Sequence, residues 1–295
     1  MIAGRASATA LLVALSVWRM GAEHGLPETS IRLAGEALHA AGGGWRALRW
    51  LARFAAGRWL LDRVEALLLP GLARHHVRRK RWLWRRLRCA PPAARLLWLG
   101  VGFDGLARAH RARSPGTPVI EFDHPDSLAL RQRLPLIAGA TANTPPALPL
   151  ALPEDSATLI ELCQQAPSTL IAEGLLMYLS PRSLLRLLRA LSRLPLPPAL
   201  WFSALEPTVG GGHGFARVHA PTRRWLRRQG EPFRWRLGRE RLQALLRRHG
   251  YRVEAVWDGA GFGEYVLCAG AGAAANATAA ATAAARRLPR ASADG

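Results

Sequence analysis

Short apolar runs alternate with helical stretches along residues 95–206, and this alternation constrains the fold more than any other feature. Each of four runs ends at a glycine or an acid: RLLWLG, PVIEFD, TLIAEG and ALWFSALE (residues 95–100, 118–123, 169–174 and 199–206). Helical periodicity lies between them, over residues 127–134 and 181–194, with Ser180 as the expected cap of the second helix. Apolar strands separated by helices predict a parallel sheet covered on both faces.

The two ends of the chain follow other patterns. Apolar residues recur at helical spacing through residues 8–18, 31–41, 45–69 and 75–87, which predicts an N-terminal helical cap over residues 1–92. At the other end, a helix over residues 239–249 precedes two strands, residues 252–258 and 264–269, joined by a Gly-rich turn. We expect these strands to form an antiparallel hairpin at one edge of a sheet domain spanning residues 93–269. The Ala-rich residues 270–295 offer no face to bury, and we expect a disordered tail there.

The chain is strongly basic, with a net charge of +21, and Lys80 is the only lysine among its 41 basic residues. The arginines are spread over most segments, so solvated helix faces explain them better than a nucleic-acid site, which stays the alternative. Three cysteines lie far apart without a C-x-x-C pair, and they favour a reducing cytoplasm without a bound metal. No apolar run reaches membrane-spanning length.

Two sequence blocks are typical of a nucleoside site. Gly100 and Gly102 follow the first strand, where a G-x-G turn lets a ligand approach the backbone; a tight turn without a ligand is the alternative. Asp123 ends the second strand and can accept hydrogen bonds from a ribose diol, with Glu121 as the next candidate. The other interpretation makes Asp123 the cap of the following helix.

A third block places Glu173 where an apolar strand meets Gly174. A carboxylate is costly to bury, so Glu173 is expected to face a polar cleft. The carboxyl ends of parallel strands line one crevice, which predicts that Gly100, Asp123 and Glu173 lie close together.

Taken in order, these blocks resemble the leucine carboxyl methyltransferase family, which includes many bacterial O-methyltransferases. RLLWLGVGFDGLA is similar to the first, glycine-rich motif of that family, VIEFDHP to its E-x-D-x-P motif, and IAEGLLMYLSP to its E-G-x-x-x-Y-L segment. Arg79-Lys80-Arg81-Trp82 resembles the R-x-R stretch before the first strand. The resemblance covers residues 5 to about 269 and implies a class I methyltransferase fold, a Rossmann-like doubly wound sheet with an antiparallel edge hairpin and an N-terminal helical layer.

The resemblance also implies that the cofactor is S-adenosyl-L-methionine. Gly100 and Gly102 are expected to pass under it, Asp123 to hold its ribose and Glu173 to contact its amino-acid or ribose portion. Arg79 is expected to bind the carboxylate of the methionine moiety through its planar fork, so Arg79 and Glu173 are not expected to pair with each other.

Two departures from the family put the adenine contact and full activity in doubt. Members of the family carry an acid after the third strand of their own fold, near the adenine. The corresponding residues here, 147–151, lack that acid, and Trp84 stands where relatives often have Asp. A non-catalytic protein that keeps the fold is therefore a second alternative.

Three residues are candidates for an acceptor pocket. Tyr178 belongs to the third motif, Glu206 ends the fourth strand, and His213 lies in the glycine-rich loop that follows. None of them is a convincing general base, which favours a carboxylate or an acidic hydroxyl as the methyl acceptor. We expect a cytoplasmic O-methyltransferase that acts on a small molecule, with no membrane partner and no catalytic side chain assigned.

Overall fold

The computed structural model describes residues 6–68, 70–90, 94–139, 144–207, 224–225, 227–259 and 261–272. Within them, seven strands form one sheet in the order β3-β2-β1-β4-β5-β7-β6. The strands are β1 (Leu96–Leu99), β2 (Val119–Asp123), β3 (Ala147–Pro149), β4 (Thr169–Ala172), β5 (Ala199–Leu205), β6 (Tyr251–Asp258) and β7 (Glu264–Ala271). β1 to β5 pair in parallel, whereas β7 is antiparallel to both β5 and β6. The predicted doubly wound sheet with an antiparallel edge hairpin is confirmed.

The helices precede the sheet or cross over between its strands. The described ones are α1 (Ala8–Met20), α2 (Glu28–Ala40), α3 (Gly43–Leu51), α4 (Ala55–Leu68), α5 (Leu72–Cys89), α6 (Leu106–Arg113), α7 (Pro125–Gln132), α8 (Pro135–Ala138), α9 (Ser156–Gln165), the 3-10 turn η1 (Leu176–Tyr178), α10 (Pro181–Ser192) and α12 (Arg239–Arg248). Ser180 caps α10 through a hydrogen bond from the Ser183 N–H, as expected.

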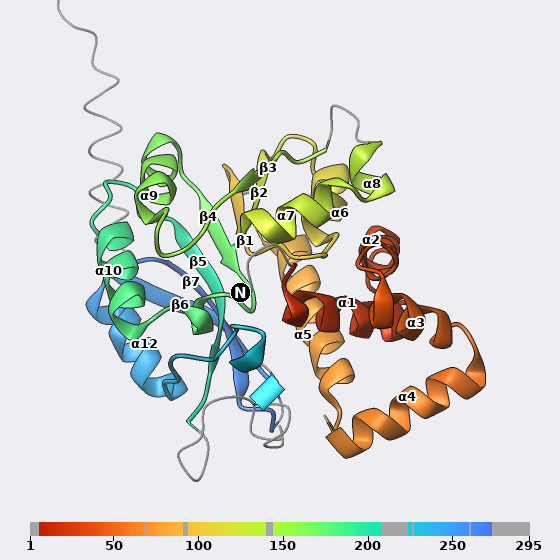
Figure 1. Ribbon diagram of the computed structural model, residues 1–295. Coiled ribbons are helices and arrows are strands. Elements are labelled where there is room, and N and C mark those ends of the chain that lie inside the picture. Colours follow the sequence, from red (N-terminus) through yellow and green to blue (C-terminus); the bar gives the residue numbers. More distant parts are fainter. Residues whose placement is uncertain are drawn as a thin grey trace, which may run out of the picture.

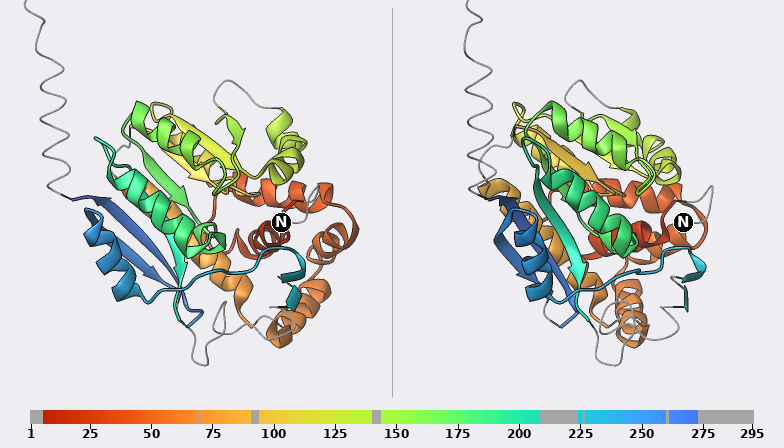
Figure 2. Two further views of the ribbon diagram at one scale, coloured as in Figure 1. Left: turned by 60° about the vertical axis from the view of Figure 1, so that its left-hand side comes forward. Right: turned by 90° about the vertical axis from the view of Figure 1, so that its left-hand side faces the viewer.

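The alternation of side chains along each strand creates two cores. Leu97 and Leu99 of β1 face α9, α10 and α12, whose leucines fill one side of the sheet. Leu96 and Trp98 face the opposite side, which is closed by α5 and α6. Figure 2 shows α9 and α10 over one face and α5 behind it.

The N-terminal helices α1 to α4 lie together beside the sheet (Figure 1). Leucines and alanines of α1 and α2 form a separate core with Val77 of α5 and Phe103. α5 also contributes Leu83 and Leu87 to the core of the sheet, so it links the two parts of the chain. The division of the chain at residue 92 stays a prediction.

Three local expectations need correction. The single helix expected over residues 45–69 is two helices, α3 and α4, and Gly57 allows their close contact because a Cβ there would lie 2.0 Å from the Leu51 carbonyl oxygen. The edge strand β3 was not expected, because it has three residues and ends in proline. β7 includes Gly270 and Ala271, which we expected in the tail; residues 273–295 lie outside the described residues.

Across the described helices, none combines the length and apolar character needed to cross a bilayer.

Candidate active site

A cavity of about 610 Å³ opens at the carboxyl ends of the central parallel strands. Its wall contains all the residues expected to hold the cofactor: Arg79, Gly100, Gly102, Asp123 and Glu173. The topology brings them together because β2, β1 and β4 are parallel neighbours, so their carboxyl ends meet at one edge. Helix α1 closes the opposite wall, and α5 supplies Arg79.

The turn after β1 needs both of its glycines. Gly100 and Gly102 have φ angles of +63° and +55°, a region that residues with side chains rarely adopt. A Cβ at Gly102 would lie 3.2 Å from Cβ of Ala10, across the cavity. The glycines therefore allow the turn and also keep this part of the cavity open.

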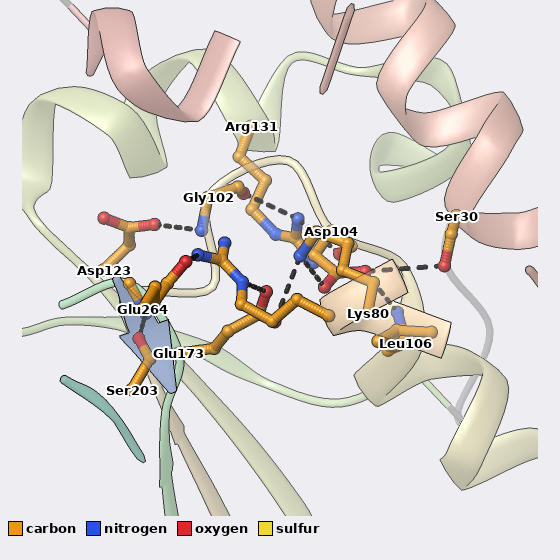
Figure 3. A network of polar contacts seen from close by, with 12 residues as sticks. Ser30, Lys80, Gly102, Asp104, Leu106, Asp123, Arg131, Glu173, Ser203 and Glu264 are labelled. Atoms are coloured by element: carbon orange, nitrogen blue, oxygen red, sulfur yellow. Dashed lines mark hydrogen bonds and ion pairs between the residues drawn. The ribbon is translucent and has the colours of Figure 1, made fainter. Parts of the chain in front are cut away.

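Asp123 holds the glycine turn from the end of β2. One carboxylate oxygen accepts the N–H of Gly102 (Figure 3), and the other accepts the N–H of His124 at 2.7 Å. Burial raises the pKa of Asp123, and the two N–H donors oppose that shift. The helix-cap interpretation is wrong, because the His124 ring accepts the Asp126 N–H and so caps α7.

Glu121 is not available to a ligand. Its carboxylate is 1% exposed and accepts two hydrogen bonds from Arg131, at 2.7 and 2.8 Å. Arg131 also donates to the carbonyl oxygens of Gly102 and Asp104, at 2.8 and 3.0 Å. The pair therefore fixes the glycine turn from below. Arg131 was not singled out from the sequence, and an arginine eight residues after Asp123 gives no sign of this role.

A buried network of ion pairs forms the floor of the cavity (Figure 3). Arg79 donates from Nε to Glu173 at 2.6 Å and from one terminal nitrogen to both oxygens of Glu264, at 2.6 and 2.8 Å. Lys80 donates to Asp104 at 2.5 Å and to Glu173 at 3.2 Å. The expectation that Arg79 and Glu173 do not pair is wrong. Both side chains are about 95% buried, and each offsets the cost of burying the other charge.

The network shifts the pKa of its buried carboxylate Glu264. Burial by itself raises that pKa, but Arg79 and the hydrogen-bonded His75 more than offset burial and hold it at about 2. His75 donates to Glu264 across 2.6 Å and stacks on Phe262 with a centroid separation of 4.5 Å. Neither Glu264 nor His75 was expected at this place, since each comes from a different end of the chain.

One nitrogen of Arg79 is left out of its ion pairs. Its Nε and one terminal nitrogen are bound by the two glutamates, while Nη2 has no hydrogen-bond partner among the described residues. Nη2 is not sealed inside the protein either, and it lies 3.6 Å from the position of a Cβ built on Gly174, which lines the cavity. Within the described part of the chain, Arg79 therefore has a single nitrogen free of protein partners, whereas we expected it to offer the two donors of its planar fork to the cofactor carboxylate.

The wall next to β3 carries the departure from the family motif. Residues 150–154 line the cavity, and Glu154 is the one acid among them. The backbone is fixed by Asp155, which accepts the Ala151 N–H at 2.7 Å. The lining of the cavity thus includes an exposed acidic residue, Glu154, shortly after the stretch 147–151 where the expected acid is absent. Trp84 packs against the core of the sheet instead.

The far end of the cavity is aromatic and polar. Tyr178 stacks on Phe233 with ring centroids 5.4 Å apart and donates to the Thr9 hydroxyl at 3.4 Å. Thr9 in turn donates its N–H and its hydroxyl to Glu231, which is 5% exposed. Burial raises the pKa of Tyr178, so its phenol stays protonated at neutral pH. Tyr178 lines the cavity as expected, whereas Thr9 and Glu231 were not singled out from the sequence.

The other two acceptor candidates are not part of this wall. Glu206 is absent from the cavity lining and pairs with Arg239, whose Nε lies 3.8 Å from it, so the expectation that Glu206 lines the pocket is wrong. The strand ends one residue earlier than expected, and Glu206 points toward the N-terminus of α12. His213 lies outside the described residues.

Comparison with known proteins gives a family match. The family model "Leucine carboxyl methyltransferase" matches residues 35–192, more than half of the chain. None of the curated proteins matches the sequence.

Three solved structures are similar to this chain at low identity. The pyocyanin biosynthetic protein PhzM is 15% identical, with a TM-score of 0.41; the match covers 68% of this chain, which spans 58% of PhzM. PigF, solved with SAH, is 14% identical, with a TM-score of 0.44 and coverage of 89% of this chain and 95% of PigF. An O-methyltransferase family 2 protein from Planctomyces limnophilus, solved with apigenin, is 14% identical, with a TM-score of 0.45 and coverage of 89% and 92%.

Proposed function

Because the chain belongs to the leucine carboxyl methyltransferase family, whose members use S-adenosylmethionine, we propose that it methylates an oxygen of a small molecule. The single observation that carries this proposal is the cavity whose wall unites the three motifs at the carboxyl ends of β1, β2 and β4. The acceptor is a carboxylate or a hydroxyl.

The residues around the cavity fit S-adenosylmethionine by their chemistry. Gly100 and Gly102 leave room beside the backbone, and the carboxylate of Asp123 keeps lone pairs for a ribose diol after it has accepted two N–H groups. Nη2 of Arg79 offers a charged donor to the cofactor carboxylate. Glu173 orients Arg79 and Lys80, so its part in binding is to position these cations. Glu154 takes the place of the missing acid on the wall next to β3.

The bound cofactor supplies a methyl group on a sulfonium, which an oxygen nucleophile displaces. The protein's own contribution is alignment and exclusion of water. Helix α1 and the segment that carries Glu231 and Phe233 cover the far end of the cavity, where the acceptor has to enter.

Calorimetric titration with S-adenosylmethionine tests the proposal, because binding precedes any question about the acceptor. We expect a single site and a rise in melting temperature at saturating cofactor. If millimolar cofactor produces no binding heat and no rise in melting temperature, the proposed function is refuted. The remaining interpretation is then a non-catalytic protein that keeps the fold.

The arginines on the outer face of α5 argue against a nucleic acid as the methyl acceptor. Arg74, Arg78, Arg81 and Arg85 line a separate groove that shares no residue with the cavity. A polyanion bound along them would therefore lie outside the cavity that holds the glycine turn. Filter binding at low and moderate salt checks this point, since phosphate-driven binding falls steeply with salt. A cytoplasmic location stays a prediction from the cysteine pattern.

A further inference from the structure

His76 is a buried histidine in the wall of the cavity that the sequence did not single out. It lies on α5, is 4% exposed, and borders the cavity beside Leu12, Val13, Val17 and Leu72. An ionisable side chain on an otherwise apolar wall is costly unless its polar atoms are bound, so the hydrogen bonds of each ring nitrogen matter.

The hydrogen bonds of Ser16 assign the tautomer of His76. The Ser16 hydroxyl donates its only hydrogen to the Leu12 carbonyl oxygen at 3.0 Å. The same hydroxyl oxygen lies 3.0 Å from Nδ1 of His76. With the hydroxyl hydrogen on the Leu12 carbonyl oxygen, which can only accept, the Ser16 oxygen accepts from Nδ1, and this arrangement puts the ring hydrogen on Nδ1. Ser16 is itself 3% exposed, which leaves this contact shielded from solvent. The other ring nitrogen, Nε2, is left with a lone pair.

Nε2 of His76 keeps accessible surface. Among the described residues it has no hydrogen-bond partner, and it is not one of the polar atoms sealed inside the protein without a partner. Because His76 lines the cavity, the cavity is the space that we assign to this nitrogen.

The surroundings keep His76 neutral. Burial lowers its pKa well below 6.5, and the charge of Arg79 lowers it further; His75 and Lys80 act in the same direction, while Glu264 opposes them. The unprotonated ring is consequently the form present at neutral pH.

From this geometry we infer that Nε2 of His76 is the general base for a phenolic acceptor, an inference that rests on the proposed methyl transfer. A carboxylate acceptor needs no base, whereas a hydroxyl has to lose its proton. The low pKa makes the His76 imidazole a weak base, so it can take the proton only as the new carbon–oxygen bond makes the hydroxyl more acidic. A phenol, whose pKa is about 10, needs a smaller increase in acidity than an aliphatic alcohol does. The apolar wall and the stacked Tyr178 and Phe233 suit an aromatic body on that acceptor.

The proton and the electrons balance in one displacement. The phenolic oxygen forms a bond to the methyl carbon while the carbon–sulfur bond breaks and its electron pair stays on sulfur. The phenolic proton moves to Nε2 of His76, and the imidazolium later releases it to water.

The first test measures the tautomer and needs no acceptor. Long-range proton–nitrogen spectra of protein labelled at histidine should show one neutral, Nδ1-protonated ring at pH 7 whose signals vanish in His76→Asn. Ser16→Ala should shift these signals, because it removes the acceptor of the Nδ1 hydrogen. An Nε2-protonated ring or an imidazolium at this position overturns the inference, whatever the activity of the protein.

The second test compares simple phenols with matched benzoates as acceptors of a labelled methyl group. His76→Asn keeps a side-chain N–H near Ser16 but has no base, so we expect transfer to phenols to fall about 100-fold or more. Affinity for S-adenosylmethionine should stay within twofold, and His39→Asn, an exposed histidine on α2, serves as the matched control.

The outcomes separate the inference from the proposed function. A wild-type protein that binds no S-adenosylmethionine refutes the proposed function. Cofactor binding with transfer only to benzoates, or undiminished phenol methylation in His76→Asn, refutes the role of His76 alone. A loss of phenol methylation in Glu231→Gln but not in His76→Asn assigns the base to Glu231 and overturns the inference. If neither acceptor class turns over, the tautomer measurement decides.

Discussion

Replacing Glu264 with glutamine probes how much the buried network stabilises the protein. Glu264 is 1% exposed and pairs with Arg79 at 2.6 Å. Removing one partner of a buried ion pair costs about 3–5 kcal/mol, because the other charge stays buried without full compensation. The pKa gives a similar figure: a fall from 4.5 to about 2 corresponds to about 3 kcal/mol of stabilisation at neutral pH. We therefore expect Glu264→Gln to lower the free energy of unfolding by about 3 kcal/mol.

The protein contains a matched control for this experiment. Arg239 and Asp258 also lie 2.6 Å apart, but their side chains are 36% and 61% exposed. An exposed pair contributes about 0–1 kcal/mol, so Asp258→Asn should change the free energy of unfolding by less than 1 kcal/mol. Urea unfolding of both variants at pH 7, followed by circular dichroism, measures the two losses in free energy of unfolding. The two ion pairs have the same length, so the difference between these losses reports the effect of burial.

The pH dependence supplies an independent check on Glu264. Its folded pKa is lower than its unfolded one, so its contribution is complete above about pH 4.5 and disappears as the pH falls toward 2. The difference in the free energy of unfolding between wild type and Glu264→Gln should therefore shrink as the pH falls from about 4.5 toward 2. Equal losses in Glu264→Gln and Asp258→Asn at pH 7, or a difference that does not depend on pH, would refute the reasoning.

Three further predictions concern the cofactor, the pH response and the C-terminus. Asp123→Ala should weaken S-adenosylmethionine binding about 30-fold in calorimetry, equivalent to about 2 kcal/mol for a lost charged hydrogen bond, and unchanged affinity would mean that the ribose is held elsewhere. The fold lowers the pKa of His76, so the unfolded chain binds more protons than the folded one below pH 6.5. For this group the free energy of unfolding should fall by up to about 1.4 kcal/mol for each pH unit below that value in urea titrations, and His76→Asn should remove this contribution to the slope. Truncation after Gly272 should leave the melting temperature nearly unchanged, whereas truncation after Ala269 should lower it, because Gly270 and Ala271 pair with β6; equal melting temperatures would contradict the extra strand residues.

Burial explains which parts of the fold could be predicted from the sequence. β1 and β4 are buried along their whole length, so their apolar runs stand out, and the observed bounds differ from the expected ones by at most two residues. β3 is partly exposed and has three residues, so it carries no such signal. The break between α3 and α4 has no proline or glycine at its own position, and the only local sign is Gly57, two residues into α4.

The site divides along a similar line. Residues that depend on backbone geometry, such as Gly100 and Asp123, stand at strand ends that the sequence reveals. The sequence does not reveal ion-pair partners in this way. Arg79 and Glu264 are 185 positions apart, and neither segment contains a pattern that indicates the other as its partner. One signal was available: Lys80 is the only lysine among 41 basic residues, and it is the one that occupies a buried position against two carboxylates. A compact ammonium can donate in both directions where the wide fork of arginine has less room.

The chemistry of the cavity depends on those polar groups in its wall that hydrogen bonds within the protein do not use. Glu173 spends one oxygen on Arg79 and the other on Lys80, so the most conspicuous acid of the third motif holds two cations in place and has little left for a ligand. The groups with unused capacity toward the cavity come from separate elements: Nη2 of Arg79, the carboxylate of Asp123 and Nε2 of His76. They are a cationic donor, an anionic acceptor and a neutral base. Such a set suits a zwitterionic nucleoside beside a weakly acidic hydroxyl, because each ligand group meets a group whose hydrogen-bonding capacity is not fully used within the protein.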